Sequence, residues 1–379
     1  MSNRNLLVLA IAAGAMIFLA AVSSQISKIG EKAPASAGPT FLIQGLDPDQ
    51  VAKITIKGGT DEVTLTRRGA NFVVTNKDSC PAAVSEINKL ITTCLNVKTA
   101  ELYTDNPANF NDLGVNEDDA RIVVKFYKPD SSLLTGFIIG KQREKGSVGY
   151  IRRVDDNKVY IMAAQVPWIK KSPIEYVDQQ LTNVKREDIE LVTVGDLNGT
   201  YVLKPGADSK TVILENLPEG KKLNEPTAIA VFNALAELKF DDVNSEATHR
   251  NLKYDRRYIC RLKNSAIYTI RLAKEGDNWF AKCDAQFMDK TPVTKTQGEV
   301  ESEEELKKKE TKLLARDVAE EFAEKHKGWV YQIPANMAEN LIKPLSALVE
   351  DIKAPNVSEP NEVSDENLTE ELEIPEKPL

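Results

Sequence analysis

Residues 6–22 form one continuous apolar stretch, LLVLAIAAGAMIFLAAV, which constrains the fold more than any other part of the chain. Arg4 precedes this stretch, and no further charged residue occurs before Lys28. A helix needs about 20 mostly apolar residues to cross the hydrocarbon core of a membrane, so the uncharged run is long enough. We therefore predict a transmembrane anchor helix within residues 1–28, with a large extramembrane part after it.

A cleaved signal peptide is the alternative, because Ala21-Val22-Ser23 offers small residues at a cleavage site. The apolar core of a signal peptide usually spans about 7–15 residues, so the longer run favours an uncleaved signal anchor. The positive charge of Arg4 favours an N-terminus on the inner side. We expect a single-pass protein of the bacterial inner (cytoplasmic) membrane, with its main domain in the periplasm.

Composition argues against nucleic acid as a partner. The formal net charge is −8 and aromatic residues make up only 6% of the chain. A nucleic-acid-binding protein usually carries a basic stripe, or basic residues interleaved with aromatic ones. Hydrophobic content is 42%, which is typical of globular proteins, so we expect about two folded domains after the anchor.

The first of these domains is expected at residues 41–188, after a linker at 29–40 that is rich in Pro, Ala, Gly and Ser. Polar and apolar residues alternate in short runs separated by turn residues, which predicts antiparallel hairpins. The strands are expected at 53–57, 63–66, 71–74, 122–127, 133–139, 149–154 and 159–162. Pro81 is expected to open one helix, whose apolar face would be Val84, Ile87, Leu90, Ile91 and Leu95.

The same order recurs in residues 189–352, which we predict as a second module of the same kind. Its strands are expected at 191–194, 200–203, 211–214, 257–263, 267–272, 279–283 and 330–333. Pro226 would open its helix, in which Ile229, Phe232 and Leu235 match the apolar positions of the first helix at a constant offset. The fold class is therefore α+β, with a duplicated module of antiparallel hairpins and one packed helix each. Two unrelated modules that share ordinary hairpins are the alternative.

A charged insertion at residues 289–327 interrupts the second module. Its sequence ESEEELKKK sets Glu and Lys at helical i,i+4 spacing. Leu306, Leu313, Val318 and Phe322 form a narrow apolar stripe, which would suit a partner-docking helix or would pack on its own domain. The stripe is short for a coiled coil, which favours packing on its own domain. Residues 353–379 are rich in Pro, Glu, Asp and Asn and are predicted to be a disordered acidic tail.

The four cysteines give no disulfide prediction. Cys80 and Cys94 flank the first predicted helix, and about 13 residues at 1.5 Å each separate them by about 20 Å. Cys260 and Cys283 are expected on the outer strands of a three-stranded meander, about 10 Å apart. Disulfide formation needs Cα atoms within about 7 Å, so we predict four small buried thiols.

No arrangement of catalytic or metal-binding residues emerges from the sequence. His249 and His326 lie far from any second ligand at metal spacing; His249 is expected in solvent and His326 at a helix end. Gly136-Phe137-Ile138-Ile139-Gly140-Lys141 approximates a phosphate-binding loop, but it is one residue short and lies within a predicted strand. The acidic pairs Asp118-Asp119, Asp155-Asp156 and Asp241-Asp242 occur in turns, where Asp is favoured for backbone reasons. We predict no catalytic, cofactor-binding or metal-binding residue and no cofactor.

Several motifs in the first half resemble a bacterial family called domain of unknown function 4340 (DUF4340). In that family a hairpin with Gly before an aromatic residue is followed by a Pro-Ala helix start, a Leu-Gly step, a Tyr-hydrophobic-Arg strand and a Trp-containing helix. The matching residues are Gly69 and Phe72, Pro81-Ala82, Leu113-Gly114, Tyr150-Ile151-Arg152 and Trp168. Phe72 departs from the family, in which Trp is common at this place. The resemblance is best over residues 41–190 and looser beyond them.

This resemblance implies a membrane-anchored extracytoplasmic protein whose relatives accompany ABC-type transporter components, and it supplies no catalytic residues. The leading hypothesis is a non-enzymatic accessory or scaffold protein that binds a transporter or another envelope complex. The alternative is an envelope enzyme or glycan-binding module, which would need Asp118, Asp155 and Asp156 to converge with Arg152 and Arg153. A third hypothesis is a spacer that holds the acidic tail at a distance. The oligomeric state stays open.

Overall fold

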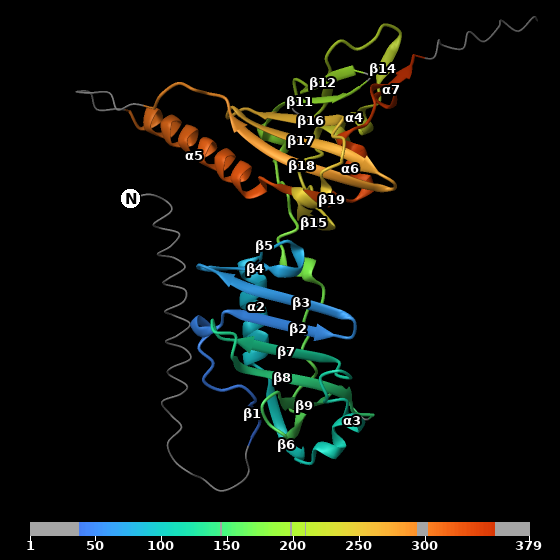
Figure 1. The fold of residues 1–379 in the computed structure, drawn as a ribbon. Helices are drawn as coiled ribbons and strands as arrows, with labels where there is room; N and C mark the ends of the chain where they lie inside the picture. Colours follow the sequence, from blue (N-terminus) through green and yellow to red (C-terminus); the bar gives the residue numbers. More distant parts are fainter. Residues whose placement is uncertain (1–37, 145, 198, 209, 294–301, 353–379) are drawn as a thin grey trace, which may run out of the picture. The chain divides into compact units, whose positions relative to one another are not determined.

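The computed structural model describes residues 38–144, 146–197, 199–208, 210–293 and 302–352 (Figure 1). The chain divides into two compact units, Met1–Asp178 (unit 1) and Gln179–Leu379 (unit 2). The predicted anchor, most of the linker and the predicted tail lie outside the described residues, as do residues 294–301 of the predicted insertion. Within the described ranges, no helix combines the length and apolar character needed to span a bilayer.

The boundary between the units lies after Asp178, whereas the sequence placed the end of the first module at residue 188. The intervening segment belongs with unit 2 because its backbone pairs with residues 235–240. The N–H of Leu181 donates to the carbonyl oxygen of Leu238 at 2.9 Å, and the N–H of Val184 donates to that of Leu235 at 3.0 Å.

Unit 1 is built on one antiparallel sheet of ten strands in the order β1-β6-β10-β9-β8-β7-β2-β3-β4-β5. The strands are β1 (Thr40–Phe41), β2 (Lys53–Gly58), β3 (Asp61–Arg68), β4 (Asn71–Val74), β5 (Cys80–Pro81), β6 (Lys98–Thr104), β7 (Ile122–Tyr127), β8 (Leu133–Gln142), β9 (Gly149–Arg153) and β10 (Val159–Met162). Helix α2 (Val84–Leu95) lies against one face of this sheet (Figure 1).

Period-2 alternation decides which face of the unit 1 sheet is apolar. Ile54 of β2 lies opposite Leu65 of β3 on one side and Phe126 of β7 on the other, and all three are fully buried. Helix α2 buries Ile87, Leu90, Ile91 and Cys94, at helical spacing. The combination of antiparallel sheets with few helices confirms the predicted mixed class.

The start of α2 differs from the prediction. Pro81 pairs with Val73 as part of β5, and the helix begins three residues later at Val84. The N–H of Ala83 donates to the carbonyl oxygen of Tyr176 at 2.7 Å, so a tertiary hydrogen bond fixes where the chain turns into the helix. Val84, expected on the apolar face, is 57% exposed because it lies in the first turn.

Residues 105–121 cover part of the second face of the unit 1 sheet. This connection from β6 to β7 contains a 3-10 turn (Pro107–Asn109) and the short helix α3 (Phe110–Leu113). It forms a small apolar cluster with the strands below it, made of Phe110, Leu113, Val115, Ala120, Val123, Ile138 and Val159.

Unit 2 contains an antiparallel sheet of eight strands in the order β13-β12-β11-β16-β17-β18-β19-β15. The strands are β11 (Ile189–Asp196), β12 (Gly199–Pro205), β13 (Val212–Leu214), β15 (Asp242–Ser245), β16 (Arg256–Leu262), β17 (Ala266–Glu275), β18 (Asn278–Phe287) and β19 (Trp329–Ile333). A separate pair joins β14 (Lys221–Leu223) to β20 (Val349–Asp351). The helices are α4 (Glu225–Phe232), α5 (Glu303–His326), α6 (Ala335–Leu341) and α7 (Leu345–Leu348).

The two sheets share one topology. In unit 1, β4-β3-β2-β7-β8-β9-β10-β6 follow one another across the sheet, and in unit 2, β13-β12-β11-β16-β17-β18-β19-β15 do the same. The corresponding strands also follow one another in the same order along the chain. Helices α2 and α4 occupy the same connection in their units. Strands β1 and β5 are additions to unit 1, and α5 is an addition to unit 2.

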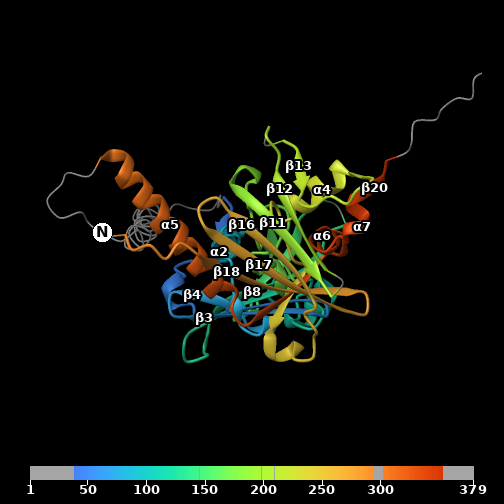
Figure 2. The same cartoon turned by 90° about the horizontal axis from the view of Figure 1, so that it is seen from above.

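Helix α5 lies along β18 and β17 through its C-terminal half (Figures 1 and 2). The residues it buries are Ala315, Ala319 and His326, and Phe322 is half-buried with its ring against Tyr268. The predicted stripe is therefore wrong for three of its four members, because Leu306, Leu313 and Val318 are exposed. Alanines allow the helix to approach the sheet closely, and this turns the larger residues outward.

Candidate functional site

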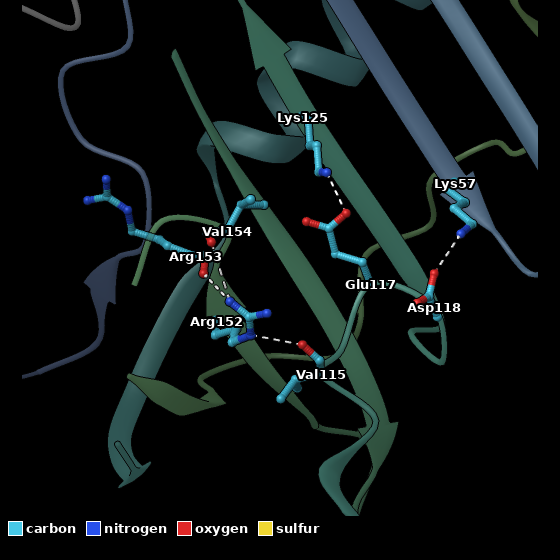
Figure 3. Close-up of polar contacts among 8 residues, drawn as sticks. All are labelled: Lys57, Val115, Glu117, Asp118, Lys125, Arg152, Arg153 and Val154. Carbon is cyan, nitrogen blue, oxygen red and sulfur yellow. Dashed lines mark hydrogen bonds and ion pairs between the residues drawn. The ribbon is translucent and has the colours of Figure 1, made fainter. Parts of the chain in front are cut away.

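Arg152 lies in the interior of β9 and is only 9% exposed. Its Nε donates to the carbonyl oxygen of Val115 at 2.8 Å (Figure 3). Its Nη1 donates to three further carbonyl oxygens, of Arg153 at 3.1 Å, Asp156 at 3.3 Å and Val154 at 3.4 Å. The guanidinium also lies over the ring of Phe110, 4.5 Å from its centroid. Arg152 thus joins the segment after α3 to the turn between β9 and β10.

The electrostatics of Arg152 are those of a buried cation held mainly by peptide dipoles. Burial lowers the pKa of the Arg152 guanidinium, and the charges of Glu117 and Asp156 act in the opposite direction. Because arginine stays protonated in proteins, the positive charge persists in this position. The carbonyl oxygens that accept from Nε and Nη1 compensate the buried charge.

Glycines bring the segment after α3 close enough to the sheet for this contact. Gly114 ends α3 in the left-handed conformation, with φ 63°. A Cβ on Gly140 of β8 would lie 2.3 Å from the carbonyl oxygen of Leu113 and 2.7 Å from Cγ1 of Val115. A Cβ on Gly136 would lie 2.5 Å from the carbonyl oxygen of Val124. The two glycines of the phosphate-loop-like sequence therefore allow neighbouring backbone segments to approach β8 closely.

Two acidic residues of the segment after α3 are paired one by one with lysines. Glu117 forms an ion pair with Lys125, and Asp118 forms one with Lys57 at 3.4 Å (Figure 3). The Asp118 side chain is 94% exposed, so water screens this pair strongly. These pairs mark where the segment of residues 115–121 meets β2 and β7.

The Arg153 side chain points away from that of Arg152 (Figure 3). Its Nε and Nη2 donate to the carboxylate of Asp155. This hydrogen-bonded pair lowers the pKa of Asp155 and raises that of Arg153. Asp156 accepts from the backbone N–H of Lys158 at 3.1 Å, as an Asp in a turn does. Asp118, Asp155 and Asp156 thus lie in separate contacts, and Arg152 and Arg153 do not bring them into one pocket.

The other acidic and histidine residues considered in the sequence also make contacts within the fold. Asp242 lies in β15 and its Oδ1 accepts from the N–H of Val243. His249, expected in solvent, is half-buried with its ring against Phe280, at a centroid distance of 4.8 Å. His326 does end a helix as expected, but it is 3% exposed, and its Nδ1 lies 2.7 Å from the hydroxyl of Tyr331. In the part of the chain that the structure describes, no three His, Cys, Asp or Glu residues are arranged to hold a metal ion.

The four cysteines all lie within the described ranges, and they are buried thiols that form no disulfide there. Cys260 and Cys283 lie on β16 and β18, the outer strands of the predicted meander. Burial raises the pKa of the Cys260 thiol to about 12, and it raises the pKa values of Cys94 and Cys283 as well. Thiols with raised pKa values are poor nucleophiles, so these residues act as small core side chains.

Sequence reasoning missed the burial of Arg152, the central residue of this site. The sequence Tyr150-Ile151-Arg152 marked Arg152 as a strand residue but carried no signal of its burial. Alternation alone assigned Arg152 to one face of β9, and it could not reveal that residues 105–121 cover that face.

Comparison with known proteins gives one match. The model of the family described as Domain of unknown function (DUF4340) matches residues 73–255, from within β4 in unit 1 to the residue before β16 in unit 2. No curated protein and no solved structure matches the chain. The matched region contains the Leu113-Gly114 step and Arg152 together with the strands that position them. Residues 73–255 of the chain therefore belong to the DUF4340 family.

Proposed function

We propose that this protein is a membrane-anchored, extracytoplasmic accessory or scaffold protein that binds a protein partner such as an ABC-type transporter or another envelope complex. The apolar run at residues 6–22 supports the anchor. The repeated strand order supports a duplicated module, with two similar units that offer surfaces for assembly. The individually paired carboxylates around Arg152 favour a structural role for that region over hydrolysis.

The outward side of α5 is the observation that carries the partner-binding proposal. Leu306, Leu313, Leu314 and Val318 are between 36% and 54% exposed, although α5 packs on unit 2 through the opposite side. Scattered exposed apolar residues are common, but Leu306 and Leu313 lie two turns apart on one side of the helix, which suits contact with another protein. The helix therefore has one side for its own sheet and a second side for a partner.

The start of α5 makes this outward side rigid. Ser302 and Glu305 form a capping box, in which the N–H of Glu305 donates to the Ser302 hydroxyl and the N–H of Ser302 donates to the Glu305 carboxylate. Such caps stabilise helix starts by about 1 kcal/mol. Three acidic residues in the first turn also suit the positive end of the helix dipole. A preformed helix loses less entropy on binding than a flexible segment would.

The test is affinity purification of the full chain from detergent-solubilised membranes, followed by mass spectrometry. We expect enrichment of a transporter permease together with its ATPase, and loss of both in the variant Leu306→Ser/Leu313→Ser. The matched control Lys307→Ser/Glu310→Ser changes two exposed residues of the same helix without removing apolar surface. Recovery of the protein alone, or equal recovery of partners with both variants, would contradict the proposal.

A further inference from the structure

One face of the unit 2 sheet is covered by helices, and the opposite face is open. On β16, Tyr258 is fully buried and its hydroxyl donates to the carbonyl oxygen of Val231 in α4, which marks the covered face. The neighbouring residues Arg257 and Ile259 point to the other side. Arg257 is exposed and Ile259 is half-buried. The same alternation runs through most of β11 and β17, so the middle of this face is open, whereas Ala273 and Phe280 at one end of it are buried.

A row of cations crosses this open face. Arg257 of β16 lies directly opposite Arg271 of β17, and Arg271 lies directly opposite Lys282 of β18. Directly opposed residues share a face and have Cβ atoms about 4.5–5.5 Å apart, so like charges there repel each other. Such a row is unfavourable unless negative charge compensates it.

Among the described residues, a carboxylate compensates the positive charge only at the Lys282 end of the row. Lys282 forms an ion pair with Glu246. Neither Arg257 nor Arg271 has a carboxylate partner in the described part of the chain. Arg257 lies across Gly195 of β11, where a Cβ would be 3.4 Å from its Nε. Asp284 shares the face but stands opposite Thr269, in the next row.

The connection between strands explains why this face is open in unit 2. In unit 1, residues 105–121 cover the corresponding region with an apolar cluster that includes Phe110. In unit 2, the equivalent connection is the shorter segment 246–255, whose His249 packs on Phe280 at one end of the sheet. This segment also reaches Lys282, whose Nζ lies over the ring of Tyr254 at 4.4 Å, but Arg257 and Arg271 stay exposed.

We propose that residues 353–379 dock on this basic face of unit 2. This segment contains eight Asp and Glu residues and two Lys residues, so its charge complements that of the row. The contact rests on Arg257 and Arg271 and not on α5, so it is independent of the partner-binding proposal. Docking neutralises the repulsion between the two guanidinium groups and occupies a sheet face that would otherwise attract other anions.

The segment leaves the described chain within reach of this face. It follows β20, which pairs with β14 in unit 2 and is held there by the ion pairs Lys221–Asp351 and Lys222–Glu350. Fully extended, residues 353–379 span about 90 Å, whereas a domain of this size has a radius of gyration of about 15 Å. A tethered segment has an effective concentration of about a millimolar, so weak charge attraction suffices for binding.

The experiment measures binding of a fluorescein-labelled peptide of residues 353–379 by fluorescence anisotropy. The proteins, in detergent, are the full chain and a chain that ends at Ile352. At low salt we expect saturable binding to the shortened chain and roughly tenfold weaker binding to the full chain, whose own segment competes. Arg257→Glu/Arg271→Glu in the shortened chain should weaken binding by roughly tenfold or more, and about 0.5 M salt should abolish it.

Controls keep the result specific. Lys239→Glu/Lys263→Glu changes two other exposed cations of unit 2 and should leave peptide binding unchanged. The fluorescence of the buried Trp279 reports whether each variant is folded, and Arg257→Gln/Arg271→Gln is the milder variant if charge reversal unfolds the unit. A peptide with Glu366→Arg and Glu370→Arg should restore binding to the charge-reversed protein.

Three results would overturn the proposal. The first is no peptide binding at low salt, and the second is equal binding to the Arg257→Glu/Arg271→Glu variant. The third is that vesicles containing phosphatidylglycerol bind the full chain as strongly as the shortened chain through the same arginines, which would make the face a lipid contact.

Discussion

The hydroxyl of Tyr258 donates a hydrogen bond to the backbone carbonyl oxygen of Val231 at 2.8 Å, which ties β16 to the end of α4. The carbonyl oxygen of Phe232, the last residue of the helix, lies 3.3 Å from the same hydroxyl. Carbonyl groups in the last turn of a helix lack partners within the helix, so a side chain from the sheet supplies one. Burial raises the pKa of Tyr258 well above its usual range, and the group remains a donor.

Tyr258→Phe should therefore destabilise unit 2 by about 1 kcal/mol, because it removes a buried donor and leaves the carbonyl oxygens less satisfied. Urea denaturation followed by the fluorescence of Trp279, which is buried in unit 2, measures this. Tyr254→Phe is the matched control, since the buried Tyr254 hydroxyl has no partner among the described residues. Equal destabilisation by both variants would show that the hydrogen bond contributes nothing.

Arg152→Met should destabilise unit 1 by about 2–4 kcal/mol, because it leaves several buried carbonyl oxygens without their charged donor. Arg153→Met removes an exposed ion pair on the same strand and should cost less than about 1 kcal/mol. Hydrogen exchange of residues 113–120 reports the local effect. If both variants exchange alike in that segment, Arg152 does not hold it to the sheet.

Gly140→Ala should destabilise unit 1 by about 1–3 kcal/mol, because the added Cβ would press against the Leu113 carbonyl oxygen and force the segment away from β8. Gly38→Ala has nothing within 4 Å of its added Cβ and should leave the free energy of unfolding unchanged. Thermal denaturation of the two variants beside the parent chain is the measurement. A Gly140→Ala chain as stable as its parent would mean that this close approach is not required.

The buried thiols predict a loss of stability in alkaline solution. Burial raises the pKa of Cys260 from 9.0 to about 12, so the folded state keeps a proton that the unfolded state releases. The contribution of the Cys260 thiol to the free energy of unfolding is present below pH 9 and is lost as the pH rises from 9 towards 12. Urea denaturation between pH 8 and 11 should show this decline, and Cys260→Ala should make it shallower. An identical slope in that variant would assign the decline to other groups.

Thiol labelling gives an independent check of cysteine burial. A thiol-specific reagent should label no cysteine of the folded chain at pH 8 and all four after denaturation, because all four are buried thiols. Rapid labelling of the folded chain at Cys80 or Cys94 would contradict the packing of α2. Rapid labelling at Cys260 or Cys283 would contradict that of the unit 2 meander.

Local sequence patterns predicted the strands that stand in the middle of each sheet. Residues 122–127 and 159–162 form β7 and β10 as expected, since alternation and turn residues act over a few neighbours. Strand β6 was not predicted, because most of its side chains are exposed and alternation is lost at the edge of the sheet. The helix start at Val84 also depended on a distant group, the carbonyl oxygen of Tyr176.

The sequence by itself determined the mixed class, the antiparallel hairpins, the repeat of elements and the resemblance that the family match bears out. Tertiary structure decided which residues face each other: it buried Arg152 beneath residues 105–121, and it aligned Arg257 with Arg271 across two strands. It also turned the alanines of α5 inward. The physical reason is range: turns and periodicity act between neighbouring residues, whereas burial and register depend on segments far apart in the chain.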